Sequence, residues 1–165
     1  MLVLEDFDIS LPWGYFDGSS QDQACGGGGI LHLDELHYFH LTTGLGRGTN
    51  NFAELMALKL LLLFALERGC RTIQVFGDSL VVIGWAQGFL RCHIMRLLPI
   101  LEDVLHIIQN FDNFSIKHVY RERNWVADGL SKEGAQIPYG QWRVTEHTPT
   151  GSYSYYHRPF HELQN

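Results

Sequence analysis

The run NNFAELMALKLLLLFALERG, residues 50–69, constrains the fold most. Between Leu55 and Leu66 its only charged side chain is Lys59, so a helix here is apolar on nearly every side and must be buried. Glu54 stands at its head. With Asn51 as the N-cap, Glu54 takes the third helical position, where a capping box and the helix dipole favour an acid. The alternative is a functional carboxylate.

Composition limits the class of protein. The chain has 165 residues, 45% of them hydrophobic, enough for one compact domain with a real core. No stretch reaches the roughly 18 apolar residues of a membrane span, and the first residues lack the pattern of a secretory signal. We therefore expect an intracellular protein of the cytoplasm or nucleus, with no membrane association. Three cysteines without CxxC spacing argue against disulfides and structural zinc.

The net charge of −6 argues against a nucleic-acid partner, because phosphate binding usually needs a basic surface. That argument weakens if several acids gather in one site that binds divalent cations. Cations bound there would offset the acids and leave the rest of the surface nearer to neutral.

Hydrophobic periodicity predicts an α/β domain. Strands are predicted at residues 13–16, from about 30, at 37–43, at 72–76 and at 114–119. Helices are predicted from the apolar run to Gly69, over 78–88, over about 95–110 and over about 124–133. Residues 44–50 (GLGRGTN) are interpreted as a loop. The first three strands form an antiparallel meander, and helical crossovers add the later strands in parallel.

Two other regions receive a structural interpretation. The domain is predicted to span residues 10–137, and residues 138–165 form an aromatic-rich extension that either packs on the domain or hangs free. The glycines at 26–29 precede no helix or Lys-Ser/Thr pair, which favours a flexible strand entry over a phosphate cradle. His157 and His161 have helical spacing, but neighbouring residues disfavour a helix and hence a metal site.

Three more acids stand at informative places. Asp17 lies at the end of the first strand, Asp78 follows the strand TIQVF, and Asp128 lies one turn into the last helix. Each has an ordinary interpretation, as a turn former, an N-cap and a solvated acid respectively. Together with Glu54 they belong to strand ends and helix starts, which converge at one edge of an α/β sheet. Clustered carboxylates are suited to hard cations such as Mg²⁺ or Mn²⁺.

The order of four motifs resembles type 1 ribonuclease H, the endonuclease that cuts the RNA strand of RNA–DNA hybrids. These motifs are FDGSS, GTNNFAEL, VFGDS and N-x-x-x-D, and the segment HVYRERN-x-x-AD-x-LS resembles the divergent branch of plant retroelements and their cellular relatives. The resemblance covers residues 13–135 approximately. It implies a five-stranded mixed sheet, three strands antiparallel and two parallel, flanked by helices, and two metal ions per site.

The resemblance also assigns site residues. Asp17, Glu54, Asp78 and Asp128 fall on the family's metal-binding acids, which carry catalysis. The substrate-binding positions are Gly18 and Ser19, which approach the 2′-hydroxyls of the RNA strand, Thr49, which contacts a DNA phosphate, and Asn50, which lies in the minor groove.

Two features depart from the family pattern. A mobile histidine often precedes the last acid, and His118 has the right separation but falls inside a predicted strand, so Arg121 is the alternative auxiliary residue. The connector GFLRCHIMR lacks a strongly basic protrusion, which predicts weak hybrid binding by the isolated chain.

The expected partner is an RNA–DNA hybrid, bound by a monomer that is a domain of a retroelement polyprotein alongside a reverse transcriptase domain. Two alternatives stay open: a non-catalytic binding module on the same fold, and another metal nuclease of the superfamily, such as an integrase or junction resolvase.

Overall fold

The computed structural model describes residues 7–159, which form one mixed sheet with helices on both faces. The strands are β1 (Trp13–Gln21), β2 (Ala24–His32), β3 (Tyr38–Arg47), β4 (Thr72–Gly77), β5 (Asn113–His118), β6 (Trp142–Thr148) and β7 (Gly151–His157). The helices are α2 (Asn50–Glu67), α3 (Leu80–Gln87), α4 (Leu98–Ile108) and α5 (Trp125–Gly134), with 3-10 turns η1 (Met95–Leu97) and η2 (Arg121–Arg123).

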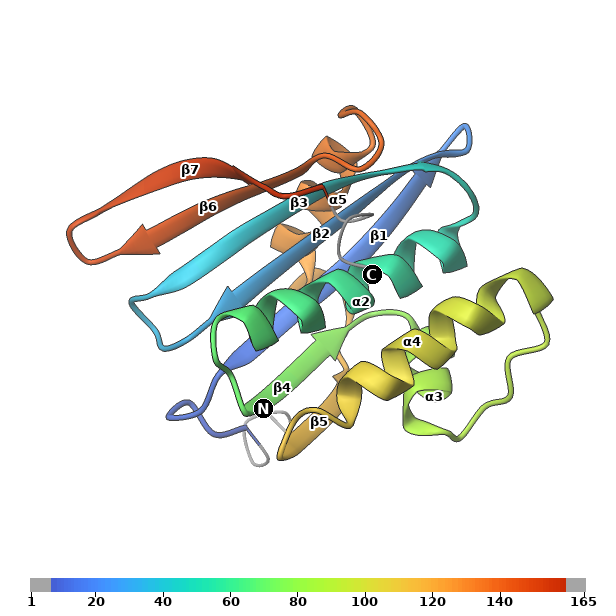
Figure 1. Ribbon diagram of the computed structural model, residues 1–165, viewed down its shortest axis with the longest axis horizontal. Helices are drawn as coiled ribbons and strands as arrows, with labels where there is room; N and C mark the ends of the chain where they lie inside the picture. The colour runs from blue at the N-terminus through green and yellow to red at the C-terminus, as the bar shows by residue number, and fades with distance from the viewer. Residues whose placement is uncertain (1–6, 160–165) are drawn as a thin grey trace.

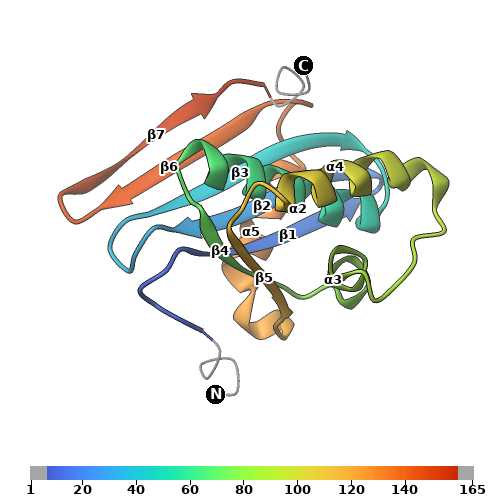
Figure 2. The ribbon, with the colours of Figure 1, turned by 60° about the horizontal axis from the view of Figure 1, so that its bottom comes forward.

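The strand order is β5-β4-β1-β2-β3-β6-β7. β4 and β5 run parallel to β1, whereas β1, β2, β3, β6 and β7 form a continuous antiparallel series. Helices α2 and α4 lie on one face of the sheet and α5 on the other (Figure 1, Figure 2). The predicted meander with two parallel additions is therefore confirmed, but the sheet has seven strands and not five.

The first hairpin is longer than predicted. β1 and β2 pair without interruption from Trp13 opposite His32 to Gln21 opposite Ala24, so Asp17 lies in the middle of a strand and not at its end. The turn consists of Asp22 and Gln23, both with positive φ, the twist that suits a two-residue hairpin. β3 likewise continues to Arg47, through most of the predicted loop, because its pairing with β2 continues that far.

The glycine run is not a flexible strand entry. Residues 26–29 lie buried in the middle of β2, paired with both β1 and β3. A Cβ atom on Gly26 would meet Ser131 O at 2.1 Å, and one on Gly28 would meet Ala127 O at 2.4 Å. The glycines therefore let the backbone of α5 approach the sheet more closely than any side chain would permit.

The apolar helix α2 is buried as predicted, packed between the sheet and α4. Lys59, the only charged residue between Leu55 and Leu66, is 6% exposed, and its Nζ lies 3.1 Å from Asp103 Oδ2 on α4. The predicted cap is wrong: Thr49 is the N-cap, and its hydroxyl accepts a hydrogen bond from the Phe52 N–H. Glu54 therefore lies in the second turn, where it has no capping role.

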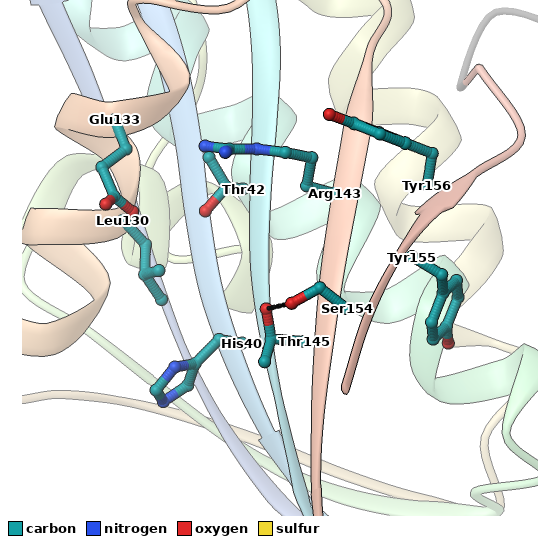
Figure 3. Close-up of a pocket in the computed structure, with 9 residues that line it drawn as sticks. All are labelled: His40, Thr42, Leu130, Glu133, Arg143, Thr145, Ser154, Tyr155 and Tyr156. Atoms are coloured by element: carbon teal, nitrogen blue, oxygen red, sulfur yellow. Dashed lines mark hydrogen bonds between the residues drawn. The ribbon is translucent and has the colours of Figure 1, made fainter. Parts of the chain in front are cut away.

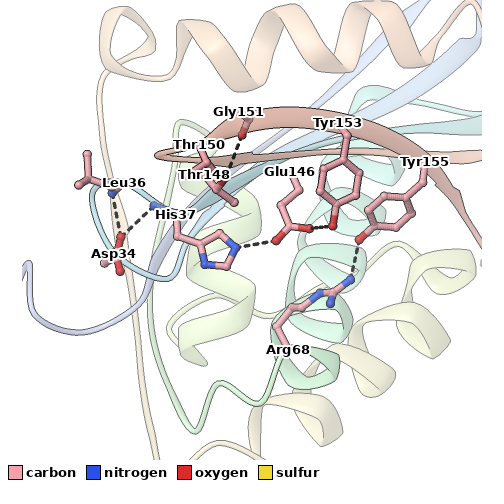
Figure 4. Close-up of polar contacts among 10 residues, drawn as sticks. All are labelled: Asp34, Leu36, His37, Arg68, Glu146, Thr148, Thr150, Gly151, Tyr153 and Tyr155. Carbon is pink, nitrogen blue, oxygen red and sulfur yellow. Dashed lines mark hydrogen bonds and ion pairs between the residues drawn. The ribbon is translucent and has the colours of Figure 1, made fainter.

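Residues from 142 onward extend the sheet instead of hanging free. β6 pairs with β3, and β7 pairs with β6. Trp142 is fully buried and stacks on His157 with ring centroids 4.0 Å apart. On this face Glu146 accepts a hydrogen bond from the Tyr153 hydroxyl and pairs with His37 (Figure 4). Where the domain ends along the chain stays a prediction.

Two further expectations concern the histidine pair His157 and His161 and the absence of a membrane span. His157 lies in a strand and its Nε2 is 2.7 Å from Glu67 Oε1, while His161 falls outside the described residues. None of the helices within residues 7–159 has the length and apolar character needed to cross a membrane.

Candidate active site

Carboxylates from three elements meet where β4 ends beside the middle of β1. Asp17 comes from β1, Glu54 from α2 and Asp78 from the residue after β4, and one oxygen of each lies within 4.8 Å of the others. Asp128 on α5 lines the same cleft, which has a volume of about 410 Å³. This site, called the acid cleft below, brings together all four acids predicted from the sequence.

Asp17 and Glu54 are the buried members of the cluster, 4% and 8% exposed. The pKa of Asp17 is raised to about 7, first by burial and then by the nearby Asp78 and Asp128. Burial also raises the pKa of Glu54, to about 10, and its carboxyl group hydrogen-bonds with that of Asp17. The site therefore disfavours negative charge unless a positive charge enters it.

The donor set fits a divalent cation. The Gly18 N–H donates to Glu54, but Glu54 Oε2 is buried without a hydrogen-bond partner among the described residues. A buried oxygen that lacks a donor costs free energy, which a bound cation would recover. Carboxylate oxygens at this density are the ligands that Mg²⁺ and Mn²⁺ prefer.

The approach of α2 to β1 depends on one glycine. A Cβ atom on Gly18 would lie 2.2 Å from the carbonyl carbon of Ala53 and 2.3 Å from Glu54 N. Only glycine allows the first turns of α2 to cross β1 so closely, and this crossing brings Glu54 beside Asp17. Gly18 therefore has a structural role in assembling the cluster.

Helix α5 is fixed to β1 at two points on either side of Asp128. The Asn124 side-chain amide, 1% exposed, donates to Phe16 O at 3.0 Å, and the Ser19 hydroxyl donates to Ser131 O at 3.0 Å. These bonds set Asp128 against Asp17. Asn124 is a positioning residue; the sequence indicated it as the first residue of the N-x-x-x-D motif and of the last helix, but not as a site residue.

Asp78 and Asp128 are half-buried and have different neighbours. The N-cap of α3 is Ser79, whose hydroxyl accepts from Val82 N–H, so Asp78 does not cap the helix and is available to the cleft. Asp128 Oδ2 lies 3.1 Å from Lys132 Nζ, one turn further along α5. Lys132, which lines the cleft, was not among the predicted site residues.

The other predicted positions separate into two groups. Gly18, Ser19, Asn50 and Arg121 line the acid cleft. Thr49 and His118 are not among its lining residues: Thr49 caps α2, and His118 ends β5 with its ring against Tyr120.

Exposed aromatic side chains lie close to the cleft in sequence. Tyr120 is 74% exposed and Trp125 is 71% exposed, on either side of the turn that contains Arg121. Tyr120 was not among the site residues predicted from the sequence. A tryptophan side chain is seldom this exposed unless it binds a partner. Trp125, three residues before Asp128, is therefore a candidate contact for a ligand of the cleft.

Comparison with known proteins assigns the family. Residues 15–134 match the family model described as reverse transcriptase-like. A search of curated proteins gives no match.

Solved structures show the same fold. Ribonuclease H1 from the halophilic archaeon Halobacterium salinarum is 27% identical, with a TM-score of 0.63 over 76% of this chain and 97% of that one. The compost-derived LC11 ribonuclease H1, in complex with an RNA/DNA hybrid, is 26% identical, with a TM-score of 0.63 over 76% of this chain and 96% of that one. The ribonuclease H domain of a Mycobacterium tuberculosis protein, 23% identical, shares the fold with a TM-score of 0.69 over 76% of this chain and 93% of that one. The chain therefore belongs to the reverse transcriptase-like family and contains a type 1 ribonuclease H domain.

Proposed function

We propose that this protein hydrolyses the RNA strand of RNA–DNA hybrids as an endonuclease, with the acid cleft as its active site. The observation that carries the proposal is the convergence of Asp17, Glu54 and Asp78 within 4.8 Å, with Asp128 in the same cleft. Without a cation, such a cluster must either take up protons or bear the repulsion between its carboxylates, and a bound divalent cation removes this cost. Phosphodiester hydrolysis is the chemistry that this arrangement suits best.

The four carboxylates would hold two Mg²⁺ or Mn²⁺ ions, with Asp17 shared between them. When bound, the ions supply a nucleophilic water and stabilise the leaving oxygen. The protein's own contribution is to fix the ligands: Gly18 seats Glu54 beside Asp17, and Asn124 ties the start of α5 to β1. Cleavage leaves a 5′-phosphate and a 3′-hydroxyl.

Residues around the cleft support binding of a nucleic acid. Asn50 and Arg121 line it, and Tyr120 and Trp125 present exposed rings next to Arg121 along the chain. Basic and aromatic side chains together are typical of surfaces that bind strands by phosphate contact and stacking. Gly18 and Ser19 follow Asp17 directly in β1 and line the cleft, and they are assigned to the RNA strand. Thr49 does not line the cleft but precedes the lining residue Asn50, and it is still assigned the contact with a DNA phosphate. Arg121, which lines the cleft, is preferred over His118 as the auxiliary residue.

The chain's setting is a separate part of the proposal. The family description supports a retroelement polyprotein, in which a reverse transcriptase domain would help to hold the hybrid. We expect an isolated monomer to bind hybrid weakly, and an intracellular location follows from the substrate.

A substrate panel tests the activity. Purified protein with Mg²⁺ should cut an RNA–DNA hybrid in its RNA strand and leave duplex DNA, duplex RNA and a four-way junction intact. Cleavage of the junction or of duplex DNA would favour a different nuclease of the superfamily. If no substrate is cut but hybrid is bound with metal-dependent affinity, the chain is a binding module, and the proposed activity is wrong.

A further inference from the structure

A second concavity lies on the α5 side of the sheet and shares no lining residue with the acid cleft (Figure 3). Its volume is about 410 Å³. The floor is formed by β3 and β6, where Thr42 pairs with Arg143 and His40 pairs with Thr145. Helix α5 forms one wall and β7 the other, so the pocket exists only because the hairpin β6–β7 extends the sheet.

Arg143 is the feature of this pocket that requires an explanation. Its Nε is buried and has no hydrogen-bond partner, and the guanidinium makes no ion pair with any described residue. Glu133 is the acid on the pocket wall, but it is exposed and lies beyond ion-pair distance of Arg143. Arginine keeps its charge at every accessible pH, so a half-buried, unpaired guanidinium is a binding group without an acceptor.

Several side chains with hydroxyl groups line the same pocket as this guanidinium. Thr42, 4% exposed, lies opposite Arg143 on β3, and the hydroxyls of Thr145 and Ser154 hydrogen-bond to each other at 2.8 Å. The Tyr156 side chain extends over the sheet toward α5, and Tyr156 is 66% exposed (Figure 3). A guanidinium fork with several hydroxyl donors matches the geometry and charge of a phosphate group.

The charge of this pocket comes from Arg143 and not from the histidines on this face. Burial lowers the pKa of His40, and the neighbouring His147 and His32 lower it further, while Arg143 is the only lysine or arginine among the described residues that line the pocket. His147 Nε2 is also buried without a hydrogen-bond partner.

The aromatic rings on this face of the sheet are not arranged to stack on the bases of a nucleic acid. The ring of His32 stacks on Trp13 with centroids 4.4 Å apart, and that of His147 stacks on Tyr38 at 4.6 Å. Because these rings cover one another, they present edges and not free faces to a ligand. Recognition in this region therefore depends on charge and hydrogen bonding.

We propose that the Arg143 pocket binds a phosphate group, as a site separate from the acid cleft and independent of its activity. The phosphate is supplied either by a small phosphorylated molecule or by the backbone of a nucleic-acid strand that crosses the sheet face. Arg143 provides the charged fork, and Thr42, Thr145, Ser154 and Tyr156 provide the surrounding donors.

Solution NMR of the full chain in the presence of a chelator tests this proposal, because without metal the acid cleft repels anions. Inorganic phosphate, a nucleoside 5′-monophosphate and a short single-stranded oligonucleotide are titrated separately. We expect saturable shifts of the Arg143 Nε–Hε signal and of the amides of Thr42 and Thr145. The probe that binds tightest identifies the source of the phosphate.

Variants separate specific binding from general charge effects. Arg143→Met should weaken binding about tenfold or more, and Arg143→Lys should have an intermediate effect because it keeps the charge but loses the fork. Arg71→Met is the matched control, since Arg71 is exposed before β4 and pairs with Asp112. Circular dichroism and thermal melting show whether each variant is folded. No shift at Arg143 with any of the three probes, or unchanged affinity in a folded Arg143→Met variant, overturns the proposal.

Discussion

Lys132 Nζ lies 3.1 Å from Asp128 Oδ2, so the last acid of the cleft already has a cationic partner in the metal-free protein. Both residues lie on α5, one turn apart. A divalent ion that binds Asp128 must therefore compete with this lysine.

We predict that Lys132→Met strengthens Mn²⁺ binding by about threefold, because it removes a competing pair of modest strength and a repelling charge. Isothermal titration calorimetry measures the effect, with Lys132→Arg as the control that keeps the charge. Weaker metal binding in Lys132→Met would show that the pair helps to organise the site.

The raised pKa of Asp17 predicts a dependence of stability on pH. A carboxyl group whose pKa rises on folding contributes stability that is complete below its unfolded value and is lost as pH rises through its folded value. For Asp17 the window runs from the ordinary value of 3.8 to about 7, and the loss is on the order of 4 kcal/mol.

Asp17→Asn should therefore be more stable than the natural chain at pH 8 without metal, and its unfolding free energy should vary less between pH 4 and pH 7. Urea unfolding in chelator measures both quantities. Adding Mg²⁺ should stabilise the natural chain more than the variant. If the unfolding free energies of the two proteins varied with pH in the same way, the proposed destabilising effect of the buried Asp17 carboxylate would be contradicted.

The glycines of β2 predict a large effect from a small substitution. Gly26→Ala places a Cβ atom 2.1 Å from Ser131 O and 2.2 Å from Ala135 N, so α5 must move away from the sheet. We expect a loss of about 2–3 kcal/mol. Gly129→Ala is the control: it also lies in this region, on α5, with nothing within 4 Å of its added Cβ, and helix propensity predicts a gain of up to about 1 kcal/mol. Equal unfolding midpoints for the two variants would refute the close-packing role.

Trp142 tests whether the hairpin β6–β7 is part of the folding unit. The side chain is fully buried against Phe64 and His157, so Trp142→Ala should cost about 3–5 kcal/mol and should shift a single unfolding transition. Tyr156→Ala, at a position 66% exposed, should change stability by less than about 0.5 kcal/mol. Two separate transitions in the natural chain would indicate an independent hairpin.

Much of the fold was predictable because its signals are local. The apolar run before Gly69 could only be a buried helix, and the order of strands and helices permits few topologies. The three cysteines are free, as their number and spacing predicted. The acids were predictable together because the end of β4 and the first turns of α2 and α5 converge on β1, although Asp17 itself lies in the middle of β1 and not at its end.

Errors arose where long-range contacts decide the outcome. The glycines at 26–29 resemble a flexible segment until α5 is placed against them, and nothing local in the sequence indicates that contact. The sequence of the hairpin β6–β7 does not alternate clearly between polar and apolar residues, because both of its faces carry polar side chains. Glu146 on one face pairs with His37, and Arg143 on the other face lies on the α5 side. Lys132 and Asn124 were missed as site residues because their roles depend on α5 lying against β1.

The most direct test incubates the purified chain with an end-labelled RNA–DNA hybrid in Mg²⁺, in Mn²⁺ and in chelator, alongside Asp78→Asn and Asp112→Asn. Asp112 is the matched control because its side chain is 63% exposed and pairs with Arg71 outside the cleft. We predict metal-dependent cuts in the RNA strand alone, retained in Asp112→Asn and reduced about a hundredfold or more in a folded Asp78→Asn variant. Undiminished cleavage by Asp78→Asn, cleavage in chelator, or an intact hybrid in every lane would contradict the assignment of the acid cleft as a ribonuclease H active site.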